Sequence, residues 1–165
     1  MPDSKNSSDK LTDDGKKFYK ELEKLKSLTV RVGYQSGETA ASSDGESTGA
    51  DLCEIAVYNE LGTATIPSRP FMRDSVDKHA DTINAFIKHQ KDLFISGKIT
   101  AEQMLNAIGV FQKGLVQSEI VDGDFEPNAP STIRRKGSDK PLIDTGKMRQ
   151  SVNYVIKKKI RRTAK

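Results

Sequence analysis

The sequence contains one cysteine, no tryptophan and no long apolar run. Because Cys53 stands alone, it can form neither an internal disulfide nor a cysteine-based zinc site. No stretch approaches the roughly 18–20 apolar residues of a membrane-spanning helix, and the N-terminus lacks the apolar core of a signal peptide. These absences predict an unexported protein without a membrane partner.

Apolar side chains are scarce throughout. Hydrophobic residues make up 35% of the 165 residues, whereas roughly 45–50% of a typical globular domain is apolar when glycine is counted. A chain of this length usually forms one domain. We therefore expect a single domain with a small core, part of whose surface is solvated or buried against partners.

Charge is divided unevenly along the chain. Residues 1–50, 51–128 and 129–165 carry net charges of −1, −5 and +10. Such blocks occur as solvated tails and also as surfaces that bind nucleic acid or an acidic protein. The sequence leaves both interpretations open.

The spacing of apolar residues predicts the secondary structure. Helices are expected over 12–27, 51–61, 70–92 and 100–122, and a short helix is expected to begin after Gly146. Strands are expected over 28–34 and 152–156. Helices and strands do not alternate regularly, which favours an α+β fold over a parallel sheet. We expect a small, mainly antiparallel sheet packed by three to four helices.

Polar segments separate and flank these elements. Residues 1–10 offer almost no apolar surface and are expected to be disordered. Residues 35–50 are predicted to form a projecting, mobile loop or hairpin tip, and residues 123–140 another loop. The folded domain then spans 11–156, and residues 157–165 form a basic C-terminal tail.

Few residues suggest chemistry at a metal or cofactor. His79 and His89 lie ten residues apart on one predicted helix, and a shared metal would need closer ligands. No Gly-Lys-Ser/Thr phosphate loop and no serine in a nucleophile elbow are present. Neither a cofactor nor a metal is expected.

Asp144 is the one candidate catalytic residue. The string "PLIDTG" at 141–146 resembles the signature of aspartic proteases, which need two carboxylates that share a proton. The sequence has no second string of this kind, and only 19 residues follow Gly146. An aspartic protease therefore stays a remote alternative that would need a symmetric dimer.

A structural role suits the same string better. Asp144 or Thr145 can cap a short helix by accepting backbone N–H groups, and Gly146 permits a close approach. Met148 and Val152 are spaced to face the core. The string is then expected to act as a hinge into the last strand.

Two longer strings carry a family resemblance. They are "VYNELGTATIPSRPFMRDSVD" at 57–77 and "PNAPSTIRRKGSDKPLIDTGKMRQSVNYVI" at 127–156. In this order they resemble the neck or tail-completion proteins of long-tailed bacteriophages, a group that includes the minor tail protein Z type and related virion-morphogenesis proteins. Leu61 stands where an aromatic residue is common, and residues 35–50 and the basic end lie outside the pattern.

The resemblance implies a structural, non-enzymatic protein of the virion head–tail junction that is made in the host cytoplasm. It implies a ring, a hexamer or dodecamer, between the connector or head-closure protein and the tail terminator or tail tube, with genomic DNA passing through the lumen. The structural and interface positions that it implies are Asn59, Glu60, Gly62, Thr63, Pro67, Arg69, Pro70, Phe71, Arg73, Asp144, Thr145, Gly146, Arg149 and Ser151. The ion pairs expected in addition join Arg69, Arg73 and Arg149 to Glu60, Asp74 and Asp144.

A nucleic-acid-binding module is the alternative function. Its phosphate contacts would come from basic side chains and would make DNA affinity strongly dependent on salt. The candidate residues are Arg134, Arg135, Lys136, Lys157, Lys158, Lys159, Arg161 and Arg162.

Overall fold

The computed structural model describes residues 11–41 and 47–159. Its elements, in chain order, are α1 (Asp13–Ser27), β1 (Leu28–Gly33), β2 (Thr39–Ala41), β3 (Ser47–Asp51), α2 (Leu52–Leu61), α3 (Phe71–Asp77), α4 (Ala80–Ile95), α5 (Ala101–Asp122), α6 (Pro130–Lys136), α7 (Lys147–Gln150) and β4 (Asn153–Lys158). The strands form two antiparallel ribbons, in which β1 pairs with β4 and β2 pairs with β3. The α+β class predicted from the sequence is confirmed, with two small ribbons in place of one sheet.

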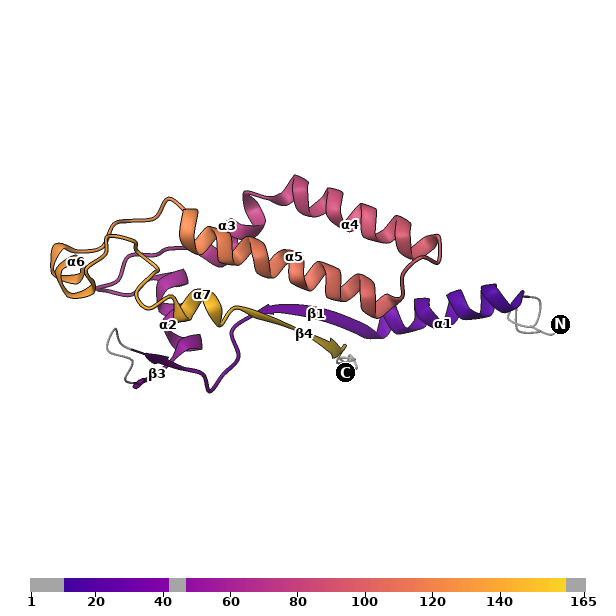
Figure 1. Cartoon of the computed structure of the whole chain (residues 1–165), viewed down its shortest axis with the longest axis horizontal. Coiled ribbons are helices and arrows are strands. Elements are labelled where there is room, and N and C mark those ends of the chain that lie inside the picture. The colour runs from indigo at the N-terminus through magenta and orange to yellow at the C-terminus, as the bar shows by residue number, and fades with distance from the viewer. Residues whose placement is uncertain (1–10, 42–46, 160–165) are drawn as a thin grey trace, which may run out of the picture.

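The molecule is elongated and layered (Figure 1). Helix α4 lies over α5, and α5 lies over the β1–β4 ribbon. Helix α1 extends from one end, whereas α2, α6 and α7 gather at the other end. The two strings of the family resemblance therefore meet at the end opposite α1.

Helix α5 is the central element. Its start is fixed by the predicted capping box, in which Thr100 Oγ1 accepts the Gln103 N–H at 3.2 Å and Gln103 Oε1 accepts the Thr100 N–H at 2.8 Å. Further along, α5 contributes buried side chains to two separate hydrophobic clusters. A helix that belongs to both clusters joins the two ends of the molecule.

The larger cluster lies at the end that holds α2 and α7, and its buried members are Leu52, Ala56, Phe71, Val116, Ile120, Leu142, Met148 and Val152. The smaller cluster consists of Phe94, Ala101 and Met104, with Leu22 and Leu25 of α1 packed against it. Met148 and Val152 are buried as predicted. The low apolar content thus produces two modest clusters in place of one large core.

The β1–β4 ribbon depends on α5 for its stability. A ribbon of two strands is marginal by itself and needs a helix or further strands to pack against. Tyr154 of β4 lies against Gly109 of α5, and its hydroxyl donates to Asn106 Oδ1 at 3.1 Å. Because glycine has no side chain, the ribbon can approach the helix closely at this point.

The predicted helix over 70–92 is wrong, because the chain breaks at Lys78 and His79 into α3 and α4. Lys78 Nζ lies 2.9 Å from Asp74 Oδ2 and 2.7 Å from Glu119 Oε1 of α5. These contacts hold the break against α5, and α4 then runs back along that helix. Apolar spacing alone does not reveal a break that a contact between distant segments stabilises.

The predicted apolar face of this segment changes with the break. Val76 and Ile87 are exposed, whereas Phe71 of α3 and Phe94 of α4 are buried. The two short helices therefore present other sides to the core than one continuous helix would.

Two further differences concern the C-terminal third. Helix α6 lies within the predicted loop 123–140; Pro130 occupies its first turn and Gly137 ends it in the left-handed conformation. Strand β4 continues to Lys158, and the Lys159 N–H donates to the Ser27 carbonyl. Residues 157–159 therefore extend the ribbon, whereas 160–165 lie outside the described residues.

Two further expectations concern residues 35–50 and residues 1–10. Residues 35–50 hold β2 and most of β3, which agrees with the hairpin interpretation, and 42–46 lie outside the described residues. The predicted disorder of 1–10 also falls outside them.

The packing of α5 gives a matched pair of glycine substitutions. In Gly109→Ala the new methyl group would overlap the Tyr154 ring, whereas nothing lies within 4 Å of the Cβ position of Gly114 in the same helix. We expect Gly109→Ala to lower the free energy of unfolding by about 1–3 kcal/mol. Gly114→Ala should raise it by up to about 1 kcal/mol. Denaturant titration measures both, and equal effects would contradict the close approach.

Candidate interaction site around Arg69

A tight loop follows α2 and begins at Gly62. Gly62 has φ +75°, and a Cβ placed there would lie 2.9 Å from the Ser68 backbone nitrogen. The Thr63 N–H donates to the Ile66 carbonyl, and Thr63 Oγ1 accepts the Ile66 N–H at 3.0 Å. Only glycine meets both the positive φ and the close approach. Gly62 and Thr63 of the first string therefore shape a loop.

Glu60 has a different role from the predicted ion pair. Its carboxylate accepts the N–H groups of Met72 at 2.8 Å and Arg73 at 3.1 Å, which lie in the first turn of α3. A carboxylate at this position satisfies donors that the helix itself leaves free. Glu60 thus fixes the start of α3 relative to the end of α2.

Arg69 is the centre of this end of the molecule. Its side chain is buried, with 5% of the residue exposed, although it carries a charge. Nε donates to the Glu126 carbonyl at 2.9 Å, and Nη2 donates to the Pro127 carbonyl at 3.3 Å and to Asn128 Oδ1 at 3.2 Å. Nη1 lies 3.5 Å from Asn59 Oδ1. Burial lowers the pKa of Arg69, and the charge of Glu126 partly offsets this effect.

Asn128 extends the network to the second string. Its amide nitrogen donates to the carbonyls of Asp139 at 3.4 Å and Lys140 at 3.1 Å. Lys136 of α6 donates to the same Lys140 carbonyl at 2.9 Å. Through these bonds Arg69 connects the loop after α2 to the segment on both sides of α6.

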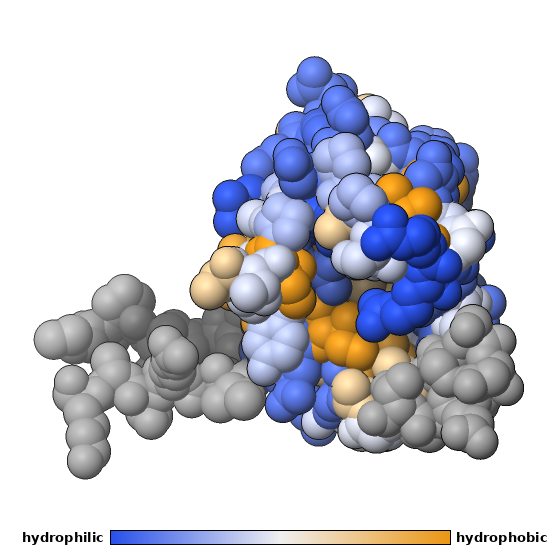
Figure 2. All heavy atoms as spheres, turned by 90° about the vertical axis from the view of Figure 1, so that its left-hand side faces the viewer, coloured by the Kyte–Doolittle hydropathy of each residue, from blue (hydrophilic) through white to orange (hydrophobic). Residues whose placement is uncertain are grey.

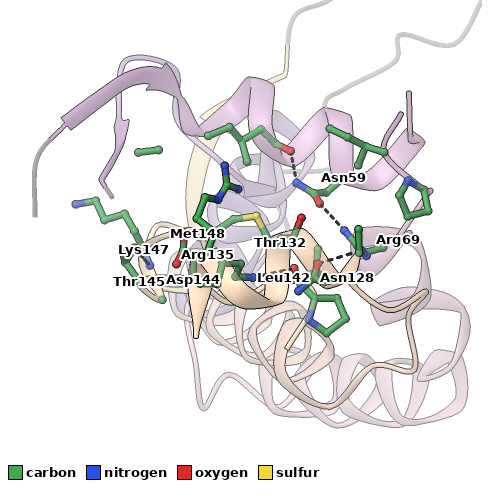
Figure 3. Close-up of a pocket in the computed structure, with 18 of the residues that line it drawn as sticks. Asn59, Arg69, Asn128, Thr132, Arg135, Leu142, Asp144, Thr145, Lys147 and Met148 are labelled. Atoms are coloured by element: carbon green, nitrogen blue, oxygen red, sulfur yellow. Dashed lines mark hydrogen bonds between the residues drawn. The ribbon is translucent and has the colours of Figure 1, made fainter. Parts of the chain in front are cut away.

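These segments surround a pocket of about 550 Å³ that lies between α2, α6 and α7 and is open to solvent. Its apolar lining consists of Ile55, Ile66, Pro67 and Pro141 together with the buried side chains of Leu52, Leu142 and Met148. Figure 3 shows Asn59, Arg69 and Asn128 on one side of the pocket, and Asp144, Thr145 and Lys147 on the other. In the view onto this end of the molecule, hydrophobic surface lies beside strongly hydrophilic side chains (Figure 2).

The pocket is rich in positive charge. Arg69, Arg135, Lys136 and Lys147 line it, and Asp144 is the only acidic residue among its described lining. Burial lowers the pKa of Lys136, Arg69 and Arg135 lower it further, and Asp144 opposes the shift. Arg69 and Lys136 donate to neutral carbonyl and amide oxygens, so their charges are not cancelled by carboxylates in these bonds. The arrangement therefore suits a negatively charged group.

The second string forms a hinge, but not through Asp144. Gly146 is the N-cap of α7 with φ +76°, and no side-chain hydrogen bond caps this helix. Thr145 Oγ1 lies 3.4 Å from the Lys147 nitrogen, whereas Asp144 is exposed. Of the two capping residues predicted, Thr145 therefore accepts a backbone N–H, that of Lys147, whereas the role predicted for Asp144 is wrong, and Gly146 supplies the left-handed conformation before the helix.

The remaining predicted ion pairs are also absent from the described residues. Arg73 and Arg149 are exposed, and no salt bridge there involves either of them or Arg69. Arg149 instead takes part through its carbonyl, which accepts from Gln117 Nε2 at 3.0 Å. Ion pairs depend on how helices and strands pack. The spacing of residues in the sequence could not reveal that Asp74 pairs with Lys78 and not with an arginine.

The other predicted site residues are mainly structural. Phe71 is completely buried and Ser151 is buried, whereas Pro67 lines the pocket and Pro70 precedes α3. Asn128 was not singled out from the sequence, because a single Asn between two prolines in a predicted loop gives no periodic signal. Its role becomes visible only through the bonds to Arg69.

The basic residues do not form one cluster. Arg134, Arg135 and Lys136 belong to α6 at one end of the molecule, whereas Lys157 and Lys158 end β4 towards α1 (Figure 1). Lys159 follows β4, and Arg161 and Arg162 lie outside the described residues. A single nucleic-acid surface that uses both groups would have to span much of the molecule's length.

The described residues contain neither a metal-binding cluster nor a membrane-spanning helix. Within 11–41 and 47–159, no three His, Cys, Asp or Glu side chains are arranged to hold a metal ion. No helix in this part of the chain is long and apolar enough to cross a membrane. Comparisons with protein-family models, curated proteins and solved structures found no significant match.

The buried guanidinium gives a second testable contrast. Arg69→Met should lower the free energy of unfolding by at least about 2 kcal/mol, because it leaves several buried oxygens without donors. Arg73→Met, at an exposed arginine nearby, should change it by less than about 0.5 kcal/mol. Thermal and denaturant unfolding of both variants measures the difference. A tolerated Arg69→Met would show that the network contributes little.

Asp144 gives the opposite expectation. Because its carboxylate caps no helix, Asp144→Asn should change the free energy of unfolding by less than about 0.5 kcal/mol. Leu142→Ala, two residues away and buried, should cost about 2–5 kcal/mol. Circular dichroism during heating compares the two. A large loss of stability in Asp144→Asn would restore the capping role.

Proposed function

We propose that this protein is a non-enzymatic structural component of the bacteriophage head–tail junction, where it forms a homo-oligomeric ring. The ring binds the connector or head-closure protein on one side and the tail terminator or tail tube on the other, and DNA passes through its lumen. The protein acts by binding, so its functional residues are those that shape and expose surfaces.

The observation that carries this proposal is the meeting of the two family-like strings at one end of the molecule. Arg69, from the first string, donates to Pro127 and Asn128 of the second across more than 50 residues of sequence. This hydrogen-bond network fixes the shape of a surface, and it does not pair a nucleophile with a general base. The residues that carry the family resemblance therefore shape one end of the molecule, and we propose that this end is an interaction surface.

The exposed surface supports the same function. Helix α2, at this end, leaves Val57, Tyr58 and Leu61 with 47%, 48% and 64% of their areas exposed. Large apolar side chains grouped on one surface are typical of sites that become buried in complexes. A subunit with two small clusters and such a surface gains further burial by assembling.

The charge distribution also favours assembly from identical copies. Residues 51–128 and residues 129–165 carry net charges of −5 and +10. A ring of identical subunits joins two different surfaces at each contact. Segments of opposite net charge within one chain are suited to contacts of this kind.

The direct test is assembly of phage particles in cells that lack this chain. We expect full heads and separate tails to accumulate, and electron microscopy should show the two joined again when the chain is supplied. Asp144→Asn should restore joining as well as the unaltered chain does. Normal joined particles without the chain would contradict the proposal, and failure of a folded Asp144→Asn protein would point to a reactive carboxylate.

A further inference from the structure

We infer that the pocket around Arg69 is the acceptor for the outer face of helix α2 from a second copy of this chain. The outer face consists of Glu54, Val57, Tyr58 and Leu61. The inference rests on the proposed ring and identifies the contact between its neighbouring subunits.

The outer face of α2 has the composition of a docking helix. Its four residues are spaced i, i+3, i+4 and i+7, which places them on one side of the helix. All four are exposed, whereas Leu52 and Ala56 on the other side are buried. The face therefore offers three apolar side chains and one carboxylate with no core of its own to cover them. Amphipathic helices commonly enter apolar grooves through such anchors.

The pocket has the complementary composition. Ile55, Ile66, Pro67 and Pro141 provide apolar surface over the buried core, and its volume of about 550 Å³ admits several side chains. Arg135, Lys136 and Lys147 provide positive charge at the edge, against one carboxylate, Asp144. An incoming helix with apolar anchors and a glutamate satisfies both features. A basic or uncharged helix would leave the cations without a partner.

The position of α2 decides that the contact is between copies. One side of α2 lines the pocket through Leu52, Ile55 and Asn59, and the outer face lies on the same short helix. A helix cannot insert its outer side into a pocket that its other side helps to build. The two surfaces therefore meet only when different copies provide them. Such a contact is heterologous and continues from copy to copy until it closes into a ring.

Other exposed apolar side chains fit the pocket less well. Val76, Ile87, Ile95 and Val110 are spread over α3, α4 and α5. Phe18 and Tyr19 lie on α1, where Phe18 already packs on Phe94 at a centroid distance of 5.5 Å. Among the helices of the described part of the chain, only α2 combines three exposed apolar residues and an acidic residue on one face beside the interaction end.

Two full-length variants test the contact by removing one surface each. The face variant is Leu61→Ser, and the pocket variant combines Arg135→Glu with Lys147→Glu. Ile95→Ser is the matched control for the first because Ile95 is exposed to a similar degree, 59%. Lys88→Glu with Lys91→Glu on α4, both exposed, is the control for the second.

Sedimentation velocity over rising concentrations, up to about 1 mM, measures self-association. We expect the unaltered chain and both controls to associate, and the face and pocket variants to associate at least about tenfold more weakly, the effect of losing one buried leucine or a paired charge. Circular dichroism establishes that each variant is folded.

Mixing the variants distinguishes this contact from other ways of associating. The pocket variant still has an intact outer face, and the face variant still has an intact pocket. Their mixture should therefore form one-to-one dimers and nothing larger, because the other two surfaces are disabled. A symmetric contact, in which each copy uses both surfaces at once, would stop at dimers already in the unaltered chain, whereas the head-to-tail contact continues beyond them.

Three results would overturn the inference: an unaltered chain that stays monomeric throughout, variants that associate like the controls, or a mixture without dimers. The proposed function fails separately. Particles that need the chain yet accept both variants would refute this contact alone. Association through these surfaces, with particles that assemble without the chain, would refute the function alone.

Discussion

Burying the guanidinium of Arg69 costs free energy unless oxygen atoms replace the water that its N–H groups lose. The chain supplies these oxygens from Asn59 at the end of α2 and from residues 126–128 after α5. Residues 126–128 belong to no helix or strand that would fix their position without these bonds. The hydrogen bonds that the buried Arg69 guanidinium requires therefore fix the positions of the loop after α2 and of the segment before α6. These two segments form walls of the pocket.

The same dependence on a few contacts holds at the other end. No residue of α1 is fully buried, and Glu21 of this helix accepts the Ala101 N–H at the start of α5 at 2.9 Å. Leu22 and Leu25 add contacts with the smaller cluster. With few apolar residues available, the protein holds its elements on α5 by single bonds and small clusters. Several large apolar side chains, among them Leu61 and Ile95, consequently stay exposed.

Local signals in the sequence were sufficient for most elements. Thr12, Asp51 and Thr100 stand at the N-caps of helices that the apolar spacing predicted. The break at Lys78 could not be predicted, because Glu119, which holds it, lies 41 residues further along the chain. Helix α6 was missed because seven residues rich in charge have no apolar period. At the site, the identities of Arg69, Gly62 and Gly146 were predicted as important, but the acceptors of Arg69 and the role of Glu60 follow only from packing.

The pocket also gives a reason for a buried charge at this position. Burying the guanidinium costs free energy, and its bonds to four oxygens fix one geometry for the segments that supply them. Arg69 places its charge beside Lys136, so each makes the other less favourable in the free subunit. That repulsion is reduced when a carboxylate enters the pocket. In the proposed contact between copies, Glu54 of a neighbouring copy would supply such a carboxylate. The free-energy cost of holding Arg69 and Lys136 side by side would then favour the proposed assembly over the free subunit.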